Sequence, residues 1–191
     1  MNEWIILLRK LTAKLDAAGI PYMICGSHAS GIYGDQRTTH DVDLVVEPTR
    51  ESLRAFVGSL GEEFYVSASA ADDAFRRRGM FNIIESATGL KADLFVRKER
   101  PFAIEGFRRR RPGRLGDLDI MLISPEDSIL SKLEWARQGE SERQVRDAIG
   151  VAAVQGEQLD LDYLRRWAVE LGVAELLEKV LEQAAREAEG V

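Results

Sequence analysis

The feature that most constrains how this chain folds is a short segment, residues 41–47, in which carboxylates first alternate with aliphatic side chains. It reads Asp-Val-Asp-Leu-Val-Val-Glu. Successive side chains along a β-strand point to opposite faces, so Asp41 and Asp43 project together while Val42 and Leu44 point into the core. The pattern predicts a buried strand whose first residues face a cleft.

Two carboxylates on one face of a strand repel each other, and a nearby cation is the usual means of keeping both ionised near neutral pH. Hard oxygen ligands on a short strand suit Mg²⁺ or Mn²⁺. A third acid, Asp93, precedes the apolar residues 94–96, with Leu94 and Val96 on its other face. If this strand lies beside the first, the three acids converge on one or two divalent ions that bridge nucleotide phosphates, a site for phosphoryl or nucleotidyl transfer.

An Asp-x-Asp pattern is not specific by itself. Acids often alternate along solvated strands, and Asp117-Leu-Asp119 is expected to be such a case. For the isolated motif at residues 41–43, a solvated strand and a metal site carry about equal weight, because charges are rarely buried without compensation.

A Gly-Ser pair lies upstream of the acids and adds context to them. Gly26 and Ser27 join an apolar segment, residues 21–25, to a short predicted helix at 28–34. Glycine permits close backbone approach, and the N–H groups at a helix N-terminus can hold a phosphate. The unit therefore resembles a phosphate cradle, although turns also use both residues routinely.

Periodicity and turn residues outline the rest of the fold. Besides the short helix at 28–34, the predicted helices before the C-terminal region cover 3–18 and 49–60, and further predicted strands cover 80–86, 91–97 and a segment ending near residue 124. Ser124 as N-cap, Pro125 at the first helical position and acids in the first turn then begin a helix. From there the pattern is helical almost to the end.

These elements predict an α/β (α+β) protein with a mixed sheet. We expect a core of residues 1–124 and a helical C-terminal region, residues 125–191, packed on that core. The tryptophans occur in helical patterns and are expected in the core rather than as stacking platforms. They are Trp4, Trp135 and Trp167.

Composition argues against several classes of protein. The chain is 45% hydrophobic and 30% charged, as in ordinary globular proteins. It has no signal-peptide pattern and no apolar run of about 20 residues that could cross a membrane, so a cytoplasmic protein is expected. Cys25 is the only cysteine, which excludes an internal disulfide and a cysteine-based zinc site. The net charge of -6 argues against a protein that coats nucleic acid, although basic runs at 76–78 and 108–111 could grip RNA or, more commonly, form solvated loops.

Three segments together resemble the nucleotidyltransferase superfamily related to DNA polymerase β. They are Gly26-Ser27, the run Arg37-Thr-Thr-His-Asp41-Val-Asp43-Leu44, and the run Lys91-Ala-Asp93-Leu-Phe-Val96. The Arg-x-Thr-x-Asp-φ-Asp-φ arrangement, where φ is apolar, is similar to that of the AbiEii-type and minimal nucleotidyltransferases of toxin–antitoxin or defence systems. The resemblance spans residues from about 20 to 150. It implies a mixed-sheet nucleotidyltransferase core.

The resemblance implies a catalytic role for each of the three acids. Asp41 and Asp43 would bind Mg²⁺, with Mn²⁺ as a substitute. Asp93 would bind a metal ion and help deprotonate an acceptor hydroxyl, which then attacks the α-phosphate of a nucleoside triphosphate and expels pyrophosphate.

The resemblance also implies a set of nucleotide-binding residues. Gly26 and Ser27 would contact phosphate, and Arg37 and Thr39 would orient the loop before the acids or touch phosphate. Lys132, in the helical region, would offset phosphate charge as a point cation. A solvated lysine whose stem covers the apolar face of its helix is an equally weighted alternative.

Three further polar residues have a functional and an ordinary explanation. Asp147 matches the closing motif of the family, but a surface acid paired with Arg143 or Arg146 is the preferred interpretation. His28 and His40 flank the Gly-Ser turn and the acids, and each is expected mainly to take part in ordinary polar packing.

The sequence therefore predicts a Mg²⁺-dependent nucleotidyltransferase that moves a nucleoside monophosphate from a nucleoside triphosphate to a hydroxyl of RNA, protein or a small molecule. The family resemblance also suggests the toxin-like member of a toxin–antitoxin or defence system, with a cognate partner protein. One alternative is a catalytically inactive module that keeps the fold and binds a nucleotide or a partner. Another is an antibiotic-modifying nucleotidyltransferase, since fold does not determine substrate.

Overall fold

The computed structural model describes residues 3–34, 41–139 and 141–189. These residues form two compact units. The first contains the described residues of 3–26 and 41–122, and the second contains those of 27–34 and 123–189. Within the described part of the chain, no helix has the length and apolar character needed to cross a membrane.

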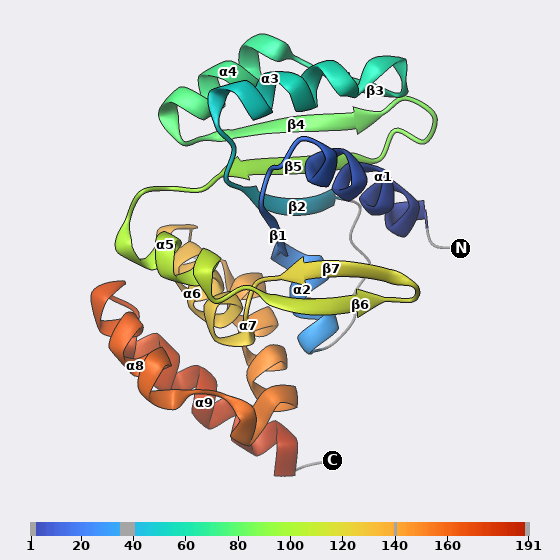
Figure 1. Cartoon of the computed structure of the whole chain (residues 1–191). Helices are drawn as coiled ribbons and strands as arrows, with labels where there is room; N and C mark the ends of the chain where they lie inside the picture. The colour runs from blue at the N-terminus through green and yellow to red at the C-terminus, as the bar shows by residue number, and fades with distance from the viewer. Residues whose placement is uncertain (1–2, 35–40, 140, 190–191) are drawn as a thin grey trace. The chain divides into compact units, whose positions relative to one another are not determined.

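The first unit is built on a mixed seven-stranded sheet with the order β3-β4-β5-β2-β1-β7-β6 (Figure 1). Its strands are β1 (Tyr22–Cys25), β2 (Asp41–Val46), β3 (Phe64–Val66), β4 (Met80–Glu85), β5 (Lys91–Val96), β6 (Arg111–Leu115) and β7 (Leu118–Leu122). The pairs β2–β5 and β1–β7 are parallel, and the other neighbouring pairs are antiparallel. The predicted α/β class with a mixed sheet is confirmed.

The two central strands that carry the acids are amphipathic by alternation. Along β2, Val42, Leu44 and Val46 are at most 1% exposed, while the residues between them are more accessible. On β5, the neighbouring residues Ala92, Leu94 and Val96 are buried in the same way. A one-residue slip in the register would exchange this buried face for the carboxylates, so the hydrophobic pattern holds the register.

Four α-helices belong to the first unit: α1 (Glu3–Ala17), α3 (Arg50–Ser59), α4 (Ala68–Arg77) and α5 (Pro101–Arg108). Helix α4 contacts β4 and β5, α3 packs against α4, and α1 packs against α3 (Figure 1). The apolar side of α1 is completely buried and consists of Leu7, Leu8, Leu11 and Leu15. Helix α3 begins at a capping box, in which Thr49 and Ser52 each bond the other's backbone N–H.

The second unit is helical. It contains α2 (Gly26–Tyr33) from its second residue onward, together with α6 (Pro125–Gly139), α7 (Glu142–Gln155), α8 (Leu161–Glu170) and α9 (Ala174–Glu189). The end of α2 lies against α7. A Cβ atom on Gly34 would come within 2.7 Å of the backbone of Gly150, and Gln155 donates a hydrogen bond to the Tyr33 carbonyl at 3.0 Å. This close helix contact depends on two small residues.

The structure confirms the predicted elements at 3–18, 21–25, 49–60, 80–86 and 91–97 to within a few residues. Three elements were missed: β3, α5 and β6. The run of arginines that was expected to form a loop lies instead at the end of α5 and the start of β6. The expectation that every tryptophan lies in the core is wrong for Trp135, which is 59% exposed on α6.

Candidate functional site

Four polar side chains share one row across the centre of the sheet. Asp43 on β2 is paired with Asp93 on β5, and the row continues to Cys25 on β1 and to Asn82 on β4. Residues that are direct partners on adjacent strands project from the same face of a sheet. The adjacency of the two acidic strands, on which the predicted metal site depends, is therefore present.

Asp41 and Lys91 form the next row on the same face, because each lies two residues before an acid of the first row. The Lys91 Nζ atom lies 3.1 Å from Asp93 Oδ2 and 3.7 Å from Asp41 Oδ2. The hydrogen bond to Asp93 raises the pKa of Lys91 above its ordinary value, and the charges of Asp93, Asp41 and Asp43 raise it further, whereas burial opposes them. The ammonium group therefore stays charged at neutral pH.

The three acids differ in their access to solvent. Asp93 is the least accessible, with 9% of its surface exposed, whereas the Asp41 side chain is 51% exposed and Asp43 is intermediate. The Asp93 Oδ1 atom is buried and accepts no hydrogen bond from the described part of the chain. A buried carboxylate oxygen without a partner is costly, and a bound cation would satisfy it.

Gly26, the residue that follows β1, is adapted to the position of Asp43. Its φ angle is +63°, in the left-handed region that favours glycine, and a Cβ atom built on it would lie 1.9 Å from Asp43 Oδ2. No other residue type fits without moving the carboxylate. The backbone of Gly26 therefore approaches this acid directly.

The carboxylate oxygens of these residues are suitable ligands for a divalent cation, but they do not converge on one point. No group of three or more His, Cys, Asp or Glu side chains within the described ranges is arranged as a metal site. Lys91 lies among the acids and already holds one oxygen of Asp93 and one of Asp41. Within the described residues, the buried oxygen that accepts no hydrogen bond is Asp93 Oδ1.

Several other predicted site residues can be placed only in part. Arg37, Thr39 and His40 lie outside the described residues. Ser27 is the second residue of α2, in a first helical turn of the kind that suits an anion. His28 is 8% exposed on the same helix.

Lys132 and Asp147 form a buried ion pair within the second unit. Lys132 Nζ lies 2.8 Å from Asp147 Oδ2, and the two side chains are 7% and 10% exposed. The solvated-lysine interpretation of Lys132 is therefore wrong, and so is the interpretation of Asp147 as a surface acid paired with Arg143 or Arg146. The amide oxygen of Gln144 also accepts a hydrogen bond from Lys132, at 3.4 Å.

The first residues of α6 form a second buried polar group. Ser124 caps the helix through the Asp127 N–H and donates to Asp127 Oδ2 at 2.7 Å. Tyr163 on α8 donates its hydroxyl to the other oxygen, Asp127 Oδ1, at 2.6 Å, and Glu126 accepts a hydrogen bond from the backbone N–H of Asp160. These bonds tie α6 to α8, so the Pro-Glu-Asp segment has a clear structural role.

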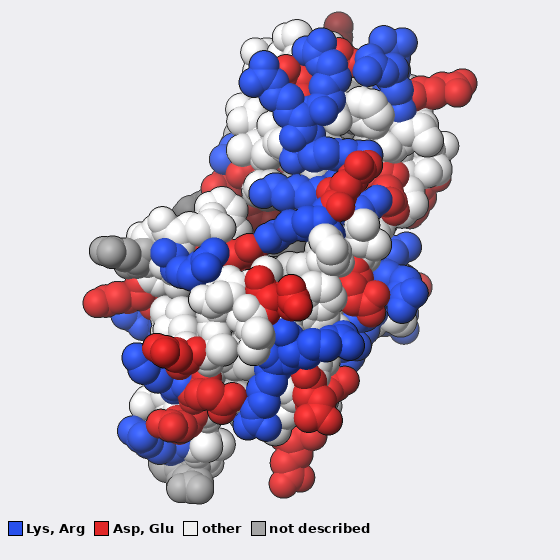
Figure 2. Space-filling model, turned by 90° about the vertical axis from the view of Figure 1, so that its left-hand side faces the viewer, with Lys and Arg blue, Asp and Glu red and all other residues white. Residues whose placement is uncertain are grey.

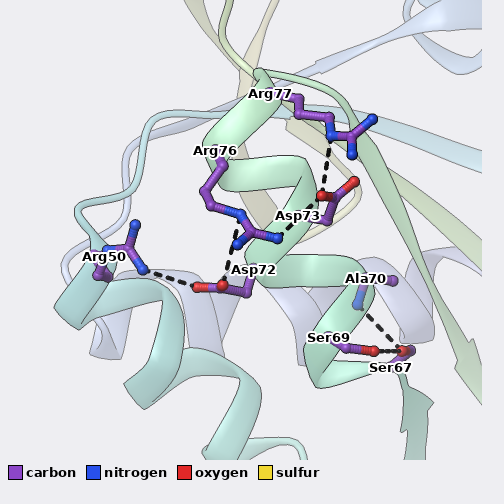
Figure 3. Close-up of polar contacts among 8 residues, drawn as sticks. All are labelled: Arg50, Ser67, Ser69, Ala70, Asp72, Asp73, Arg76 and Arg77. Carbon is purple, nitrogen blue, oxygen red and sulfur yellow. Dashed lines mark hydrogen bonds and ion pairs between the residues drawn. The ribbon is translucent and has the colours of Figure 1, made fainter.

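The arginines of the basic run at 76–78 are each paired with an acid. Figure 2 shows Lys and Arg side chains interleaved with Asp and Glu on one face. On α4, Arg76 and Arg77 both contact Asp73, and Asp72 lies between Arg76 and Arg50 of α3 (Figure 3). Exposed pairs of this kind contribute up to about 1 kcal/mol each, and they neutralise the positive charge that an RNA-binding surface would need.

Sequence reasoning missed two members of the site. The signal for Lys91 was available, because its position two residues before Asp93 places it on the same face of any strand. Asn82 could be assigned only from the pairing of β4 with β5, which lies beyond a turn whose register the sequence does not specify.

No family model matches this sequence, and no curated protein matches it. Solved structures do resemble it. The solution structure of the antibiotic-resistance factor ANT(2'')-Ia has a TM-score of 0.59 at 18% identity, covering 87% of this chain and 94% of that one. The crystal structure of ANT(2'')-Ia in complex with adenylyl-2''-tobramycin has a TM-score of 0.59 at 16% identity, covering 87% and 97%.

An antigenic nucleotidyltransferase-like protein from Paracoccidioides brasiliensis is similar to the same degree, with a TM-score of 0.58 at 19% identity, covering 88% of this chain and 90% of that one. Identities this low establish the fold and leave the substrate open. The chain has the nucleotidyltransferase fold, in agreement with the superfamily resemblance of its sequence. The narrower resemblance to AbiEii-type proteins has no counterpart among these structures.

Proposed function

We propose that this protein is a nucleotidyltransferase that transfers a nucleoside monophosphate from a nucleoside triphosphate to a hydroxyl group, with Mg²⁺ or Mn²⁺ held by Asp41, Asp43 and Asp93. One observation carries the proposal: Asp43 and Asp93 are direct partners on adjacent parallel strands, and Asp41 lies on the same face. A solvated strand, the ordinary explanation of an Asp-x-Asp pattern, does not account for the buried oxygen of Asp93 that accepts no hydrogen bond from the described residues.

A divalent ion bound to these carboxylates would neutralise phosphate oxygens and lower the pKa of an acceptor hydroxyl. Asp93 would accept the proton of that hydroxyl, and it is the most buried of the three acids. The acceptor oxygen then forms a bond to the α-phosphorus, and the bond from that phosphorus to the β-phosphate oxygen breaks. Pyrophosphate leaves with the bonding electrons.

The chain supplies positioning as well as charge. Gly26 allows the backbone to approach Asp43 closely, and the N–H groups of the first turn of α2 are suited to phosphate oxygens. Ser27 lies in that turn. Arg37 and Thr39 are proposed to contribute to the same nucleotide site, on the strength of the sequence resemblance alone.

Nucleotide binding tests the proposal directly. Titration calorimetry of each nucleoside triphosphate in the presence of Mg²⁺ is expected to show binding to the wild-type protein and strong loss of binding in Asp43→Asn. Asp119→Asn is a matched control, because Asp119 belongs to the other Asp-x-Asp sequence and its side chain is 90% exposed. Equal binding by all three proteins would count against a metal site at Asp43.

A small-molecule acceptor is a second candidate, because two of the similar structures are of an antibiotic-resistance factor and one of them contains adenylyl-2''-tobramycin. Incubation with ATP, Mg²⁺ and tobramycin, followed by mass spectrometry, would reveal an adenylylated product. Its absence, with transfer to RNA or protein present, would favour the toxin-like role and a cognate partner protein. A binding-only module would keep its cellular effect in Asp41→Asn and Asp93→Asn, whereas an enzyme would lose it.

A further inference from the structure

The distinctive feature of the candidate site is a lysine among its acids. Lys91 lies on β5 directly opposite Asp41 and two residues before Asp93, so its side chain emerges on the face that carries all three carboxylates. Its ammonium group contacts Asp93 at 3.1 Å and Asp41 at 3.7 Å. These are distances at which an ammonium and a carboxylate attract each other strongly.

We propose that Lys91 is a built-in counter-ion that competes with divalent metal ions for Asp41 and Asp93. This inference rests on the proposed function, since it assigns a regulatory role to a residue within the same site. In the metal-free protein the ammonium relieves the repulsion among the three acids. When an ion binds between these strands, the ammonium has to leave the carboxylate oxygens that it holds or share them.

The positions of the carboxylate oxygens indicate that Lys91 competes with a metal ion rather than helping to bind it. Lys91 contacts Oδ2 of Asp93, and Oδ1 of the same carboxylate is the buried oxygen without a hydrogen bond from the described chain. An ion that used both Asp93 and Asp41 would approach the place where the ammonium lies. A metal ion and the Lys91 ammonium would repel each other when they lie this close together, and partial burial limits the screening of this repulsion by solvent.

The lysine side chain can also withdraw. It is 33% exposed, and the Asp41 side chain that it contacts is 51% exposed, so one side of this pair borders solvent. Lysine is a flexible point charge with several rotatable bonds, unlike the planar fork of arginine. The ammonium can therefore move outward without unfolding the strand, while Asp93 stays fixed in the sheet.

The competition predicts that removing the charge strengthens metal binding. Free Mn²⁺ is titrated against the full-length protein by electron paramagnetic resonance, without nucleotide, for wild type, Lys91→Met, Lys91→Gln and Lys91→Arg. Lys91→Met and Lys91→Gln are expected to bind Mn²⁺ on the order of tenfold more tightly than wild type, and Lys91→Arg to bind about as weakly as wild type. Asp93→Asn serves as the control for site identity, and its addition to Lys91→Met should abolish the tight binding.

Thermal unfolding gives a second readout that does not depend on activity. In EDTA, Lys91→Met should melt below wild type, because its three acids repel each other without a counter-ion. Saturating Mn²⁺ should raise the melting temperature of Lys91→Met more than that of wild type, since tighter binding to the native state stabilises it more. If either neutral variant fails to fold, the other supplies both measurements.

The outcomes separate this inference from the proposed function. Tighter Mn²⁺ binding by the neutral variants supports the counter-ion role. Unchanged or weaker Mn²⁺ binding by them, with measurable binding by wild type, overturns it and leaves the metal site intact. Absence of Mn²⁺ binding by wild type and all variants overturns both.

Discussion

Asp43 and Asp93 are direct partners on parallel strands β2 and β5, and a Cβ atom on Gly26 would fall within 1.9 Å of the Asp43 carboxylate. The register that brings the acids together is held by the opposite face of the same strands, where Val42 and Leu44 are completely buried. Core packing and the candidate active site thus depend on one alignment, because a slip of one residue would bury the carboxylates.

The first prediction concerns the glycine beside Asp43. Gly26→Ala is expected to abolish Mg²⁺-dependent nucleotide binding and to destabilise the protein. The new methyl group would meet Asp43 Oδ2, Cγ and Cβ at 1.9, 2.7 and 2.9 Å, so the carboxylate has to turn away. Left-handed backbone adds a cost of about 1 kcal/mol for any residue with a Cβ atom. Titration calorimetry and chemical denaturation measure the two effects.

Gly19→Ala is the matched control for this substitution. Gly19 has nearly the same φ angle, +64°, but no atom lies within 4 Å of the position that its Cβ atom would take. It is expected to lose a similar backbone contribution of about 1 kcal/mol and to keep normal nucleotide binding. Normal nucleotide binding by Gly26→Ala would show that Asp43 is not needed in its present position.

The second prediction concerns the buried ion pair of the helical unit. Lys132→Met is expected to lower the free energy of unfolding by about 3 kcal/mol or more, because it leaves the Asp147 carboxylate buried without its cation. That side chain is only 10% exposed. Urea denaturation followed by circular dichroism measures the change.

A double variant separates the structural role of Lys132 from its proposed nucleotide role. Lys132→Met combined with Asp147→Leu removes both charges, and it should recover most of the lost stability. If Lys132 also contacts phosphate, this stable double variant still binds nucleoside triphosphates more weakly than wild type. Full stability in the single Lys132→Met variant would contradict the buried pair.

The third prediction is that the stability of the protein depends on pH through Glu85, the last residue of β4. Lys10 Nζ lies 2.7 Å from Glu85 Oε1, and Glu85 is 2% exposed. The hydrogen bond from Lys10, followed by the one from Thr88, lowers the pKa of Glu85 below its ordinary value. Ionised Glu85 therefore stabilises the native state above the ordinary glutamate pKa of about 4.3, and this contribution is lost as the pH falls through the lowered pKa.

Lys10→Met tests this linkage. It should be less stable than wild type at pH 7, and the difference in the free energy of unfolding should shrink as the pH approaches and falls below about 4. Lys14→Met is a suitable control, because Lys14 lies on the same helix and donates to the backbone oxygen of Ser59 rather than to a carboxylate. A difference that stays constant from pH 7 to pH 4 would refute the assignment.

The sequence contained enough information to predict the central part of the fold. Apolar side chains alternate along residues 41–46 and 91–96 because one face of each strand is buried. This pattern is local, so it can be recognised from the sequence. The edge strand β6 was missed because Pro112 and Gly113 normally mark turns, and only an edge strand accepts a proline without losing a shared hydrogen bond.

The residues of the candidate site could be predicted where alternate side chains of one strand share a face. They could not be predicted where the site depends on contacts between segments far apart in the sequence. Asp41 and Asp43 share a face in any strand. The burial of Lys132 and Asp147 was not predictable, because their positions on two helical segments do not specify which faces meet. Trp135 shows the converse error, since helical periodicity alone did not reveal that its side of α6 is exposed.

The central claim is nucleotidyl transfer that depends on the paired acids. The most direct test incubates purified protein with each α-³²P-labelled nucleoside triphosphate, Mg²⁺ and total cell extract. Asp41→Asn/Asp43→Asn is the inactive variant, and Asp117→Asn/Asp119→Asn is the matched control, because the same sequence pattern there is exposed, with side chains 79% and 90% accessible.

We predict that wild type and the exposed-acid control transfer label to RNA, protein or a small molecule, and that the variant lacking Asp41 and Asp43 carboxylates transfers at least about 100-fold less. The labelled fraction then identifies the acceptor class. Label transferred equally by all three proteins, or by none of them when each is folded and Mn²⁺ has also been tried, would contradict the proposed function.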